Sequence, residues 1–225
     1  MRVTIHGDDE QLHSVLGSVA GVTVDDSEAA DLVVAVGEAP LRACAARGEE
    51  RPVLSVGLDA DWSCAADSLP EIVAPYTDRP LPTVDAAPLV VSTDGAESTA
   101  VFDTTLVTSE PARISEYAVS VAGRQHATFR ADGVVVASPL GSHGYARAAG
   151  GPLLDFGTGL AVVPIAPFAT IADSWIVQPP LSVRVERETS VTVYADTDRI
   201  ATGRSGLTVE VETGEPLSVV DQRRL

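Results

Sequence analysis

Lysine is absent from this chain of 225 residues, and all 15 basic residues are arginine. They face 32 acidic residues, so the formal net charge is −17 at pH 7. A surface this negative repels the phosphate backbone, which argues against a protein that binds DNA or RNA. Many acids with arginine in place of lysine are typical of a high-salt cytoplasm, as in halophilic archaea. An acidic protein from a GC-rich mesophile is the alternative.

Cysteine and histidine are scarce as well. Cys44 and Cys64 form no CxxC pair, so we expect free thiols in a reducing cytoplasm. The four histidines have no metal-ligand spacing among themselves or with the cysteines, so no intrinsic metal site is predicted. No apolar run is as long as a membrane span, and no signal peptide follows Met1. These absences predict a cytoplasmic protein without a membrane partner.

Residues 1–75 alternate between strand and helix patterns. Strands are predicted at 3–5, 22–24, 31–36 and 52–56, and helices around 12–19 and over 41–47. The run 31–36 is apolar on both faces, as a central parallel strand should be. The pattern predicts a small N-terminal doubly wound α/β domain.

Prolines are dense between Pro70 and Pro88, which marks residues 76–99 as a linker or crossover. Beyond it the chain reads as short strands separated by turns, and Gly123 is predicted to join two of them in a hairpin. The expected strands are 100–107, 116–121, 125–129, 160–165, 181–185, 191–195, 207–211 and 217–220. Residues 100–225 are therefore predicted to form a β-rich, sandwich-like domain.

The segment 132–152 reads DGVVVASPLGSHGYARAAGGP. It predicts a turn at Asp132-Gly133, a buried strand over 134–137 and a short helix from Tyr145 that Ser142 caps and 150–152 ends. A strand, a glycine loop and a helix N-terminus together present backbone N–H groups to a phosphate or another polar ligand. A purely structural corner is the alternative.

The same segment resembles the NAD kinase signature, whose usual form is close to DG-x5-PTGSTAYSLSAGGP. The Asp-Gly, Gly-Ser, Tyr and Ala-Gly-Gly-Pro elements keep identity and spacing, so the chain is identified as a divergent member of this family. The resemblance implies an α/β domain and a β-rich domain with the nucleotide site in the cleft between them. It also implies transfer of a phosphoryl group from ATP or polyphosphate to the ribose 2′-hydroxyl of NAD, which gives NADP with the help of Mg²⁺.

The resemblance further implies a set of nucleotide-binding residues. Tyr145 would stack on adenine, His143 would lie at its edge, and Asp132 would contact the dinucleotide. Taken singly, these residues could instead be a core aromatic, a solvated imidazole and a turn residue. The full predicted set is Gly37, Asp103, Asp132, Gly133, Gly141, Ser142, His143, Tyr145, Ala148, Gly150 and Gly151.

Two motifs of the family are altered in this chain. Where the family has a GGDG loop whose Asp serves as the base, residues 36–43 read VGEAPLRA, which leaves Glu38 as the only acid. Pro40 beside it has no N–H to offer a phosphate. An ordinary strand-to-helix turn, with Pro40 at the first helical position and Glu38 in a solvated loop, is the alternative.

The second altered motif is the family's Asn-Glu pair, which is replaced by Phe102-Asp103. Asp103 can act for the Glu, but Phe102 lacks the hydrogen-bonding amide of Asn. Later in the chain Ser174-Trp175 and Asp196-Thr197 replace an Arg-Pro and an Asp-Gly. Two hypotheses stay open: an NAD kinase with Glu38 as base, or a non-catalytic NAD(P)-binding paralogue with a regulatory or partner role. Association of identical chains is left open too.

Overall fold

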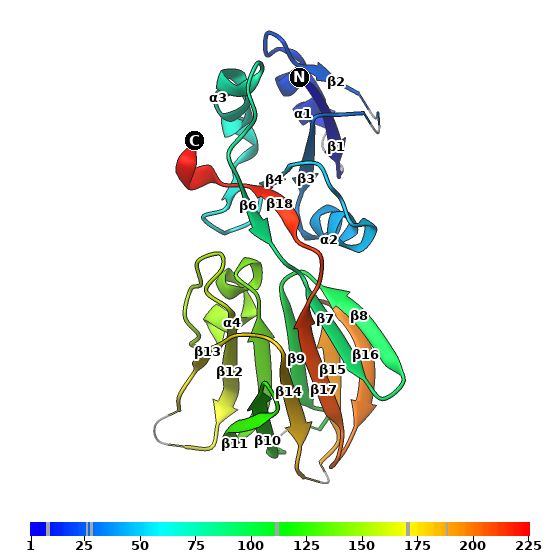
Figure 1. Cartoon of the computed structure of the whole chain (residues 1–225), viewed down its shortest axis with the longest axis vertical. Helices are drawn as coiled ribbons and strands as arrows, with labels where there is room; N and C mark the ends of the chain where they lie inside the picture. Colours follow the sequence, from blue (N-terminus) through cyan, green and yellow to red (C-terminus); the bar gives the residue numbers. More distant parts are fainter. Residues whose placement is uncertain (8–9, 26, 28, 111–112, 170–171, 188) are drawn as a thin grey trace. The chain divides into compact units, whose positions relative to one another are not determined.

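The computed structural model describes residues 1–7, 10–25, 27, 29–110, 113–169, 172–187 and 189–225, and the chain divides into two compact units. Unit 1 contains residues 1–86 and 216–225, and unit 2 contains residues 87–215 (Figure 1). The predicted division into 1–75, a linker 76–99 and 100–225 differs at three places, the first being residues 76–86, which belong to unit 1. Residues 87–99 belong to the sheet of unit 2, and residues 216–225 return to unit 1.

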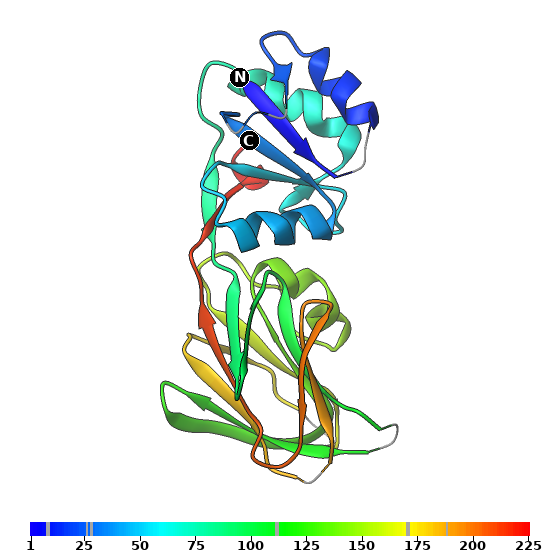
Figure 2. The same cartoon turned by 90° about the vertical axis from the view of Figure 1, so that its right-hand side faces the viewer.

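Unit 1 is a sheet with helices on both faces. Its strands follow the order β2-β1-β3-β4-β18-β6, with β5 beside β4, and all pairs are parallel except β18 with β6. Helices α1 and α3 cover one face of this sheet and α2 covers the other (Figure 2). The elements are β1 (Arg2–His6), α1 (Glu10–Gly17), β2 (Thr23–Val24), β3 (Leu32–Val36), α2 (Glu38–Arg47), β4 (Val53–Val56), β5 (Ser63–Cys64), α3 (Leu69–Val73), β6 (Thr83–Ala86), β18 (Leu217–Val220) and the 3₁₀ turns Ala66–Ser68, Ala74–Tyr76 and Gln222–Arg224.

The apolar runs explain this arrangement. All four residues of β4 and the first four of β3 are buried, because each strand packs against helices on both of its faces. Leu12 and Leu16 of α1 pack with Leu69 and Val73 of α3 in one cluster on the sheet. The predicted doubly wound α/β architecture is confirmed.

Unit 2 contains a single 11-stranded sheet whose largest cluster of buried hydrophobic residues draws on most of its strands, and a smaller cluster packs around α4. Its strand order is β16-β15-β9-β11-β10-β14-β17-β7-β8, and β12 and β13 extend from β11. The elements are β7 (Leu89–Thr93), β8 (Ala96–Ala100), β9 (Asp103–Thr108), β10 (Ser115–Val121), β11 (Arg124–Ala137), the 3₁₀ turn η3 (Leu140–His143), α4 (Tyr145–Ala148), β12 (Leu160–Pro167), β13 (Trp175–Val177), β14 (Leu181–Val185), β15 (Val191–Ala195), β16 (Asp198–Gly203) and β17 (Thr208–Thr213).

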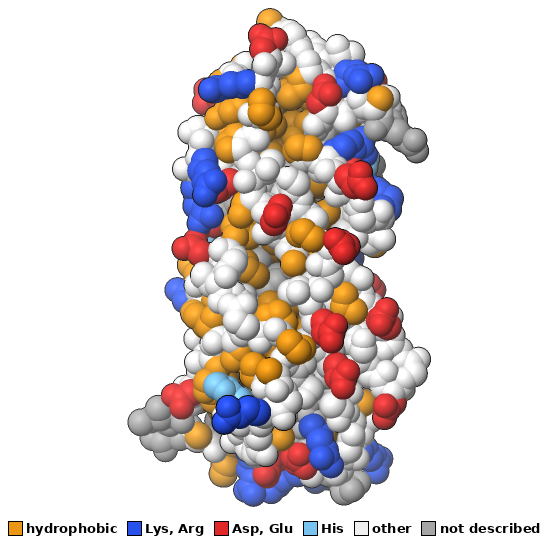
Figure 3. Space-filling view, viewed as in Figure 1, with side chains coloured by type: hydrophobic (Ala, Val, Ile, Leu, Met, Phe, Trp, Pro, Cys, Tyr) orange, Lys and Arg blue, Asp and Glu red, His pale blue; other side chains and the backbone are white. Residues whose placement is uncertain are grey.

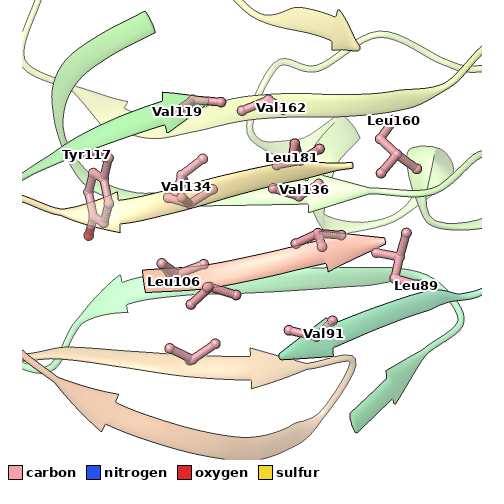
Figure 4. Packing of buried hydrophobic residues seen from close by; sticks show 14 of the residues in the cluster. Leu89, Val91, Leu106, Tyr117, Val119, Val134, Val136, Leu160, Val162 and Leu181 are labelled. Carbon is pink, nitrogen blue, oxygen red and sulfur yellow. The ribbon is translucent and has the colours of Figure 1, made fainter. Parts of the chain in front are cut away.

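The core of unit 2 is built from alternate residues of these strands. Val119, Val134 and Val162 come from three strands and point into the same interior, together with Leu106 and Leu181 (Figure 4). The intervening residues of strands such as β14 and β17 are more exposed, which is the period of two that a half-buried strand requires. The predicted β-rich, sandwich-like domain is confirmed.

The predicted hairpin at Gly123 is present, and its second strand is longer than expected. Ala122 and Gly123 both have positive φ, 47° and 75°, as a tight hairpin turn between twisted strands requires. β11 then continues for 14 residues, through Asp132-Gly133 and up to Ala137.

The face shown in Figure 3 carries both acidic and basic side chains. On the face shown in Figure 3, acidic side chains lie across both units. Among the described residues, no helix is long and apolar enough to cross a membrane.

Candidate functional site

Strand β11 leads into the segment 132–152, which we call the signature segment; its residues 138–144 are the signature loop. Residues 134–137 are buried, and the strand is hydrogen-bonded to β9 on one side and β12 on the other. A β-carbon on Gly133 would lie 2.5 Å from the carbonyl oxygen of Leu106, so glycine is required by this close approach. The predicted turn at Asp132-Gly133 is wrong, because pairing on both sides keeps this backbone extended.

The signature loop is fixed to the residues that precede β9. The Oγ of Ser138 donates to the carbonyl of Val101 (2.7 Å) and accepts the N–H of Gly141 (3.2 Å). The N–H of Ser138 donates to the carbonyl of Phe102 (2.9 Å). Gly141 packs on the same peptide group, since a β-carbon there would lie 2.0 Å from the carbonyl oxygen of Phe102. The loop is therefore held in one conformation relative to residues 101–102.

The Ser142 hydroxyl links the signature loop to the residues that follow the signature segment, and it does not cap a helix. Its side chain is fully buried, and its Oγ donates to the carbonyl of Pro139 (2.9 Å) and accepts the N–H of Leu154 (3.1 Å). Helix α4 has only four residues and no side-chain cap at its N-terminus. The N–H of Gly144 donates to the carbonyl of Gly141 (3.1 Å). The predicted cap is wrong, and the N–H groups of Gly141 and Gly144 are used inside the loop instead of facing a phosphate.

Tyr145 is exposed to solvent, as are Arg147 and Ala148 of the same short helix. It begins α4 and is 47% exposed, so it is not a core aromatic. His143, just before it, is half-buried, and Ala148 is exposed. The helix ends where predicted: Gly150 has a φ of +93°, and the N–H of Gly151 donates to the carbonyl of Ala146 (2.8 Å). An exposed ring on a rigid corner is available for stacking.

Asp132 lies away from the loop along β11. At the rise of an extended strand it is about 17 Å before Ala137, where the strand ends. Its backbone carbonyl accepts a 3.4 Å hydrogen bond from the hydroxyl of Tyr117, whose ring is fully buried. Burial raises the pKa of Tyr117 well above its usual value, and the negative charge of Asp132 raises it further. The strand thus separates Asp132 from the signature loop.

Asp103 begins β9 and lies opposite Ala137 of β11, so it sits next to the start of the signature loop. Its carboxylate accepts a hydrogen bond from the hydroxyl of Thr105 (3.0 Å), and its side chain is half-buried. Asp196 reaches the same place from the turn after β15, where its carboxylate accepts backbone N–H groups of residues 101–103. The sequence showed Asp196 only as a departure from a family motif. These hydrogen bonds join residues that are 93 to 95 positions apart, so no local pattern in the sequence predicts them.

Gly37 and Glu38 lie in unit 1, whereas the other candidates belong to unit 2. Gly37 has a φ of +82° and its N–H donates to the carbonyl of Val56 (2.9 Å), which turns the chain directly from β3 into α2. Helix α2 begins at Glu38, so Pro40 is its third residue and not its first. Proline is tolerated there because N–H groups of the first helical turn have no partner in the helix. The Glu38 side chain is exposed.

Both cysteines lie in unit 1, where the Cys44 thiol is 3.9 Å from Nδ1 of His6. Cys44 and Cys64 are free and buried, as expected of thiols outside a disulfide. Burial raises the pKa of Cys64 to about 11 and also raises that of Cys44, so both thiols stay protonated at neutral pH. Within the described part of the chain, no group of three or more His, Cys, Asp or Glu side chains could hold a metal ion.

Comparisons with known proteins point to one family. The sequence model of the ATP-NAD kinase C-terminal domain matches residues 103–219. The NAD kinase of Methanocorpusculum labreanum is 31% identical over 175 residues, which cover 74% of this chain and 64% of that protein. The NAD kinase of Methanospirillum hungatei is 33% identical over 108 residues, or 46% of this chain and 40% of that protein. The matches thus span less than two thirds of these relatives.

Solved structures agree on the fold. Yeast NADH kinase in complex with NADH superimposes with a TM-score of 0.75 at 15% identity, over 99% of this chain and 85% of that one. An NAD kinase from Archaeoglobus fulgidus in complex with ATP also gives a TM-score of 0.75, at 20% identity, over 100% of this chain and 95% of that one.

Proposed function

The chain belongs to the ATP-NAD kinase family, and from this premise we propose that it binds an adenine dinucleotide and phosphorylates the ribose 2′-hydroxyl of NAD with ATP. The observation that carries the proposal is the construction of the signature segment. Gly133, Gly141 and Gly151 stand where a β-carbon would collide with the backbone or a packed side chain. The hydroxyls of Ser138 and Ser142 each donate and accept a hydrogen bond, while Tyr145 stays exposed. Such rigidity is what a preorganised binding surface needs.

Tyr145 and His143 are proposed to receive the adenine. The Tyr145 ring offers an aromatic face, and His143, two residues earlier, can donate or accept a hydrogen bond at the base edge. Asp103, next to the loop, is proposed to bind the ribose hydroxyls as a carboxylate acceptor. All three side chains belong to unit 2.

Glu38 is proposed to orient the accepting hydroxyl and take its proton, since it is the acid at the position of the family's loop aspartate. The hydroxyl oxygen forms a bond to the γ-phosphorus of ATP, the bond from that phosphorus to the β,γ-bridging oxygen breaks, and ADP leaves. Phosphoryl transfer asks little covalent chemistry of the protein beyond positioning and charge neutralisation. Mg²⁺ would enter with ATP as part of the substrate, held by the phosphate oxygens.

The direct test is to incubate the purified protein with NAD, ATP and Mg²⁺ in molar KCl and to measure NADP. Parallel reactions with NADH in place of NAD, and with polyphosphate in place of ATP, define acceptor and donor. NADP formation that requires both substrates is the expected result. A folded protein that binds NAD by calorimetry but forms no NADP would instead be the non-catalytic paralogue.

A further inference from the structure

Asp196 makes an unusual set of hydrogen bonds. One carboxylate oxygen accepts the N–H of Val101 (2.9 Å), and the other accepts those of Phe102 (2.8 Å) and Asp103 (3.1 Å). In return, the N–H of Asp196 donates to the carbonyl of Asp103 (2.8 Å). Three successive N–H groups that converge on one anion form a backbone nest, and here a side chain of the same chain fills it.

The other side of this short stretch holds the signature loop. The carbonyls of Val101 and Phe102 accept hydrogen bonds from the side chain and backbone of Ser138, and Gly141 packs on the peptide group of Phe102. Residues 101–103 are thus held from two sides: Asp196 bonds to their three N–H groups and to the carbonyl of Asp103, and Ser138 of the signature loop bonds to the carbonyls of Val101 and Phe102. Any shift of this stretch would move both Asp103 and the loop.

Asp196 makes these hydrogen bonds from a left-handed backbone conformation. Its φ is +50°, which glycine adopts without strain and which Asp and Asn adopt more often than other residues with a side chain. The Asp196 carboxylate accepts the backbone N–H groups of residues 101–103 from this turn. Charge-assisted hydrogen bonds of this kind are about twice as strong as neutral ones.

We propose that Asp196 is a positioning residue, which fixes Asp103 and the signature loop in the arrangement that receives the nucleotide. This inference rests on the proposed function for the ligand. It assigns Asp196 no contact with the nucleotide and no part in the proton transfer. Its effect passes through residues 101–103, so it should appear in nucleotide affinity and in the protection of that backbone.

The experiment compares Asp196→Gly, Asp196→Asn and Asp94→Asn with the wild type in molar KCl. Glycine keeps the left-handed turn and removes the acceptors, whereas asparagine keeps one acceptor oxygen. Asp94 is an exposed acid in the turn between β7 and β8, so Asp94→Asn controls for the loss of one charge. NAD affinity is measured by calorimetry below the melting temperature of each variant, and hydrogen exchange is followed over 101–103 and 138–142.

Asp196→Gly is expected to weaken NAD binding on the order of tenfold and to speed exchange in both stretches, because the supporting shell of a site sets its geometry. Asp196→Asn should fall between Asp196→Gly and the wild type, and Asp94→Asn should match the wild type. If folded Asp196→Gly binds NAD with an affinity within about twofold of the wild type, the inference is overturned. A tenfold change in affinity corresponds to roughly 1.4 kcal/mol, so a twofold change is below about 0.5 kcal/mol. Should Asp196→Gly fail to fold, Asp196→Asn decides by the same criterion.

Failure of the proposed function gives a different result. If the folded wild type binds no NAD, that function is wrong, and hydrogen exchange alone decides the positioning role. Faster exchange over 138–142 in Asp196→Gly then supports that role, and unchanged exchange there overturns it.

Discussion

The α-carbon of Gly141 lies against the peptide group of Phe102, although one residue belongs to the signature loop and the other precedes β9. A β-carbon on Gly141 would come within 2.0 Å of the Phe102 carbonyl oxygen, which no real contact allows. The contact joins the signature segment, which carries most of the predicted nucleotide-binding residues of unit 2, to the stretch that leads into Asp103. Glycine at position 141 is therefore required by this packing, in addition to being part of the family signature.

Gly141→Ala should destabilise the protein by about 1–3 kcal/mol or more, because the methyl group forces the backbone apart. Gly17→Ala is the matched control, since nothing lies within 4 Å of a β-carbon there and its φ is not left-handed. The free energies of unfolding from denaturant titrations check the pair. Equal stability of both variants would contradict the close approach.

Tyr145→Ala should weaken NAD binding by roughly 1–3 kcal/mol if the exposed ring stacks on adenine. Tyr145→Phe keeps the ring and should bind almost as the wild type does. Because Tyr145 is 47% exposed, neither change should lower the melting temperature appreciably. Calorimetry with NAD gives the affinities, and an unchanged affinity in Tyr145→Ala would remove the stacking role.

Glu38→Gln should abolish NADP formation while NAD binding persists, since the amide cannot take the proton of the hydroxyl. Glu50→Gln, another exposed acid of unit 1, should leave the rate unchanged. Glu38→Asp tests reach, because it shortens the side chain by one methylene. Full activity in Glu38→Gln would show that another group orients the hydroxyl.

Glu49→Gln should destabilise the protein at neutral pH by about 1–2 kcal/mol, because Glu49 is largely buried and pairs with Arg51 at 2.6 Å. The hydrogen bond from Arg51 lowers the pKa of Glu49 in the folded state below its usual 4.5. The stabilisation is therefore present above pH 4.5 and is lost as the pH falls through the lower folded pKa. Unfolding free energies of both proteins should converge on acidification, and a difference that persists below that range would contradict the ion pair.

The melting temperature should rise between about 0.1 M and 3 M KCl, as screening relaxes the repulsion among excess carboxylates. A rise of at least about 3 °C, or roughly 1 kcal/mol for a chain of this size, is expected. The net charge of −17 motivates the prediction. A NaCl series and a sucrose control separate screening from general exclusion effects, and a flat melting temperature would reject the halophilic interpretation.

The sequence by itself determined the architecture. Period-two valines produced the strands of unit 2, runs such as 31–36 that are apolar on both faces produced the parallel sheet of unit 1, and Gly123 and Gly150 marked a hairpin and a helix end. These signals are local, because hydrophobic periodicity and turn glycines can be recognised from residues close together in the chain. The family signature was readable for the same reason, since its elements fall within one short segment.

Only the tertiary structure decided what the polar residues do. Asp132-Gly133 has the composition of a turn, yet pairing with β9 and β12 keeps it in a strand. Ser142 has the place of a helix cap, yet its hydroxyl bonds to Pro139 and Leu154. Asp196 binds N–H groups far away in sequence. A polar group can form a hydrogen bond only with a partner that folding places within about 3 Å of it. The spacing of residues along the chain does not show which partner that will be.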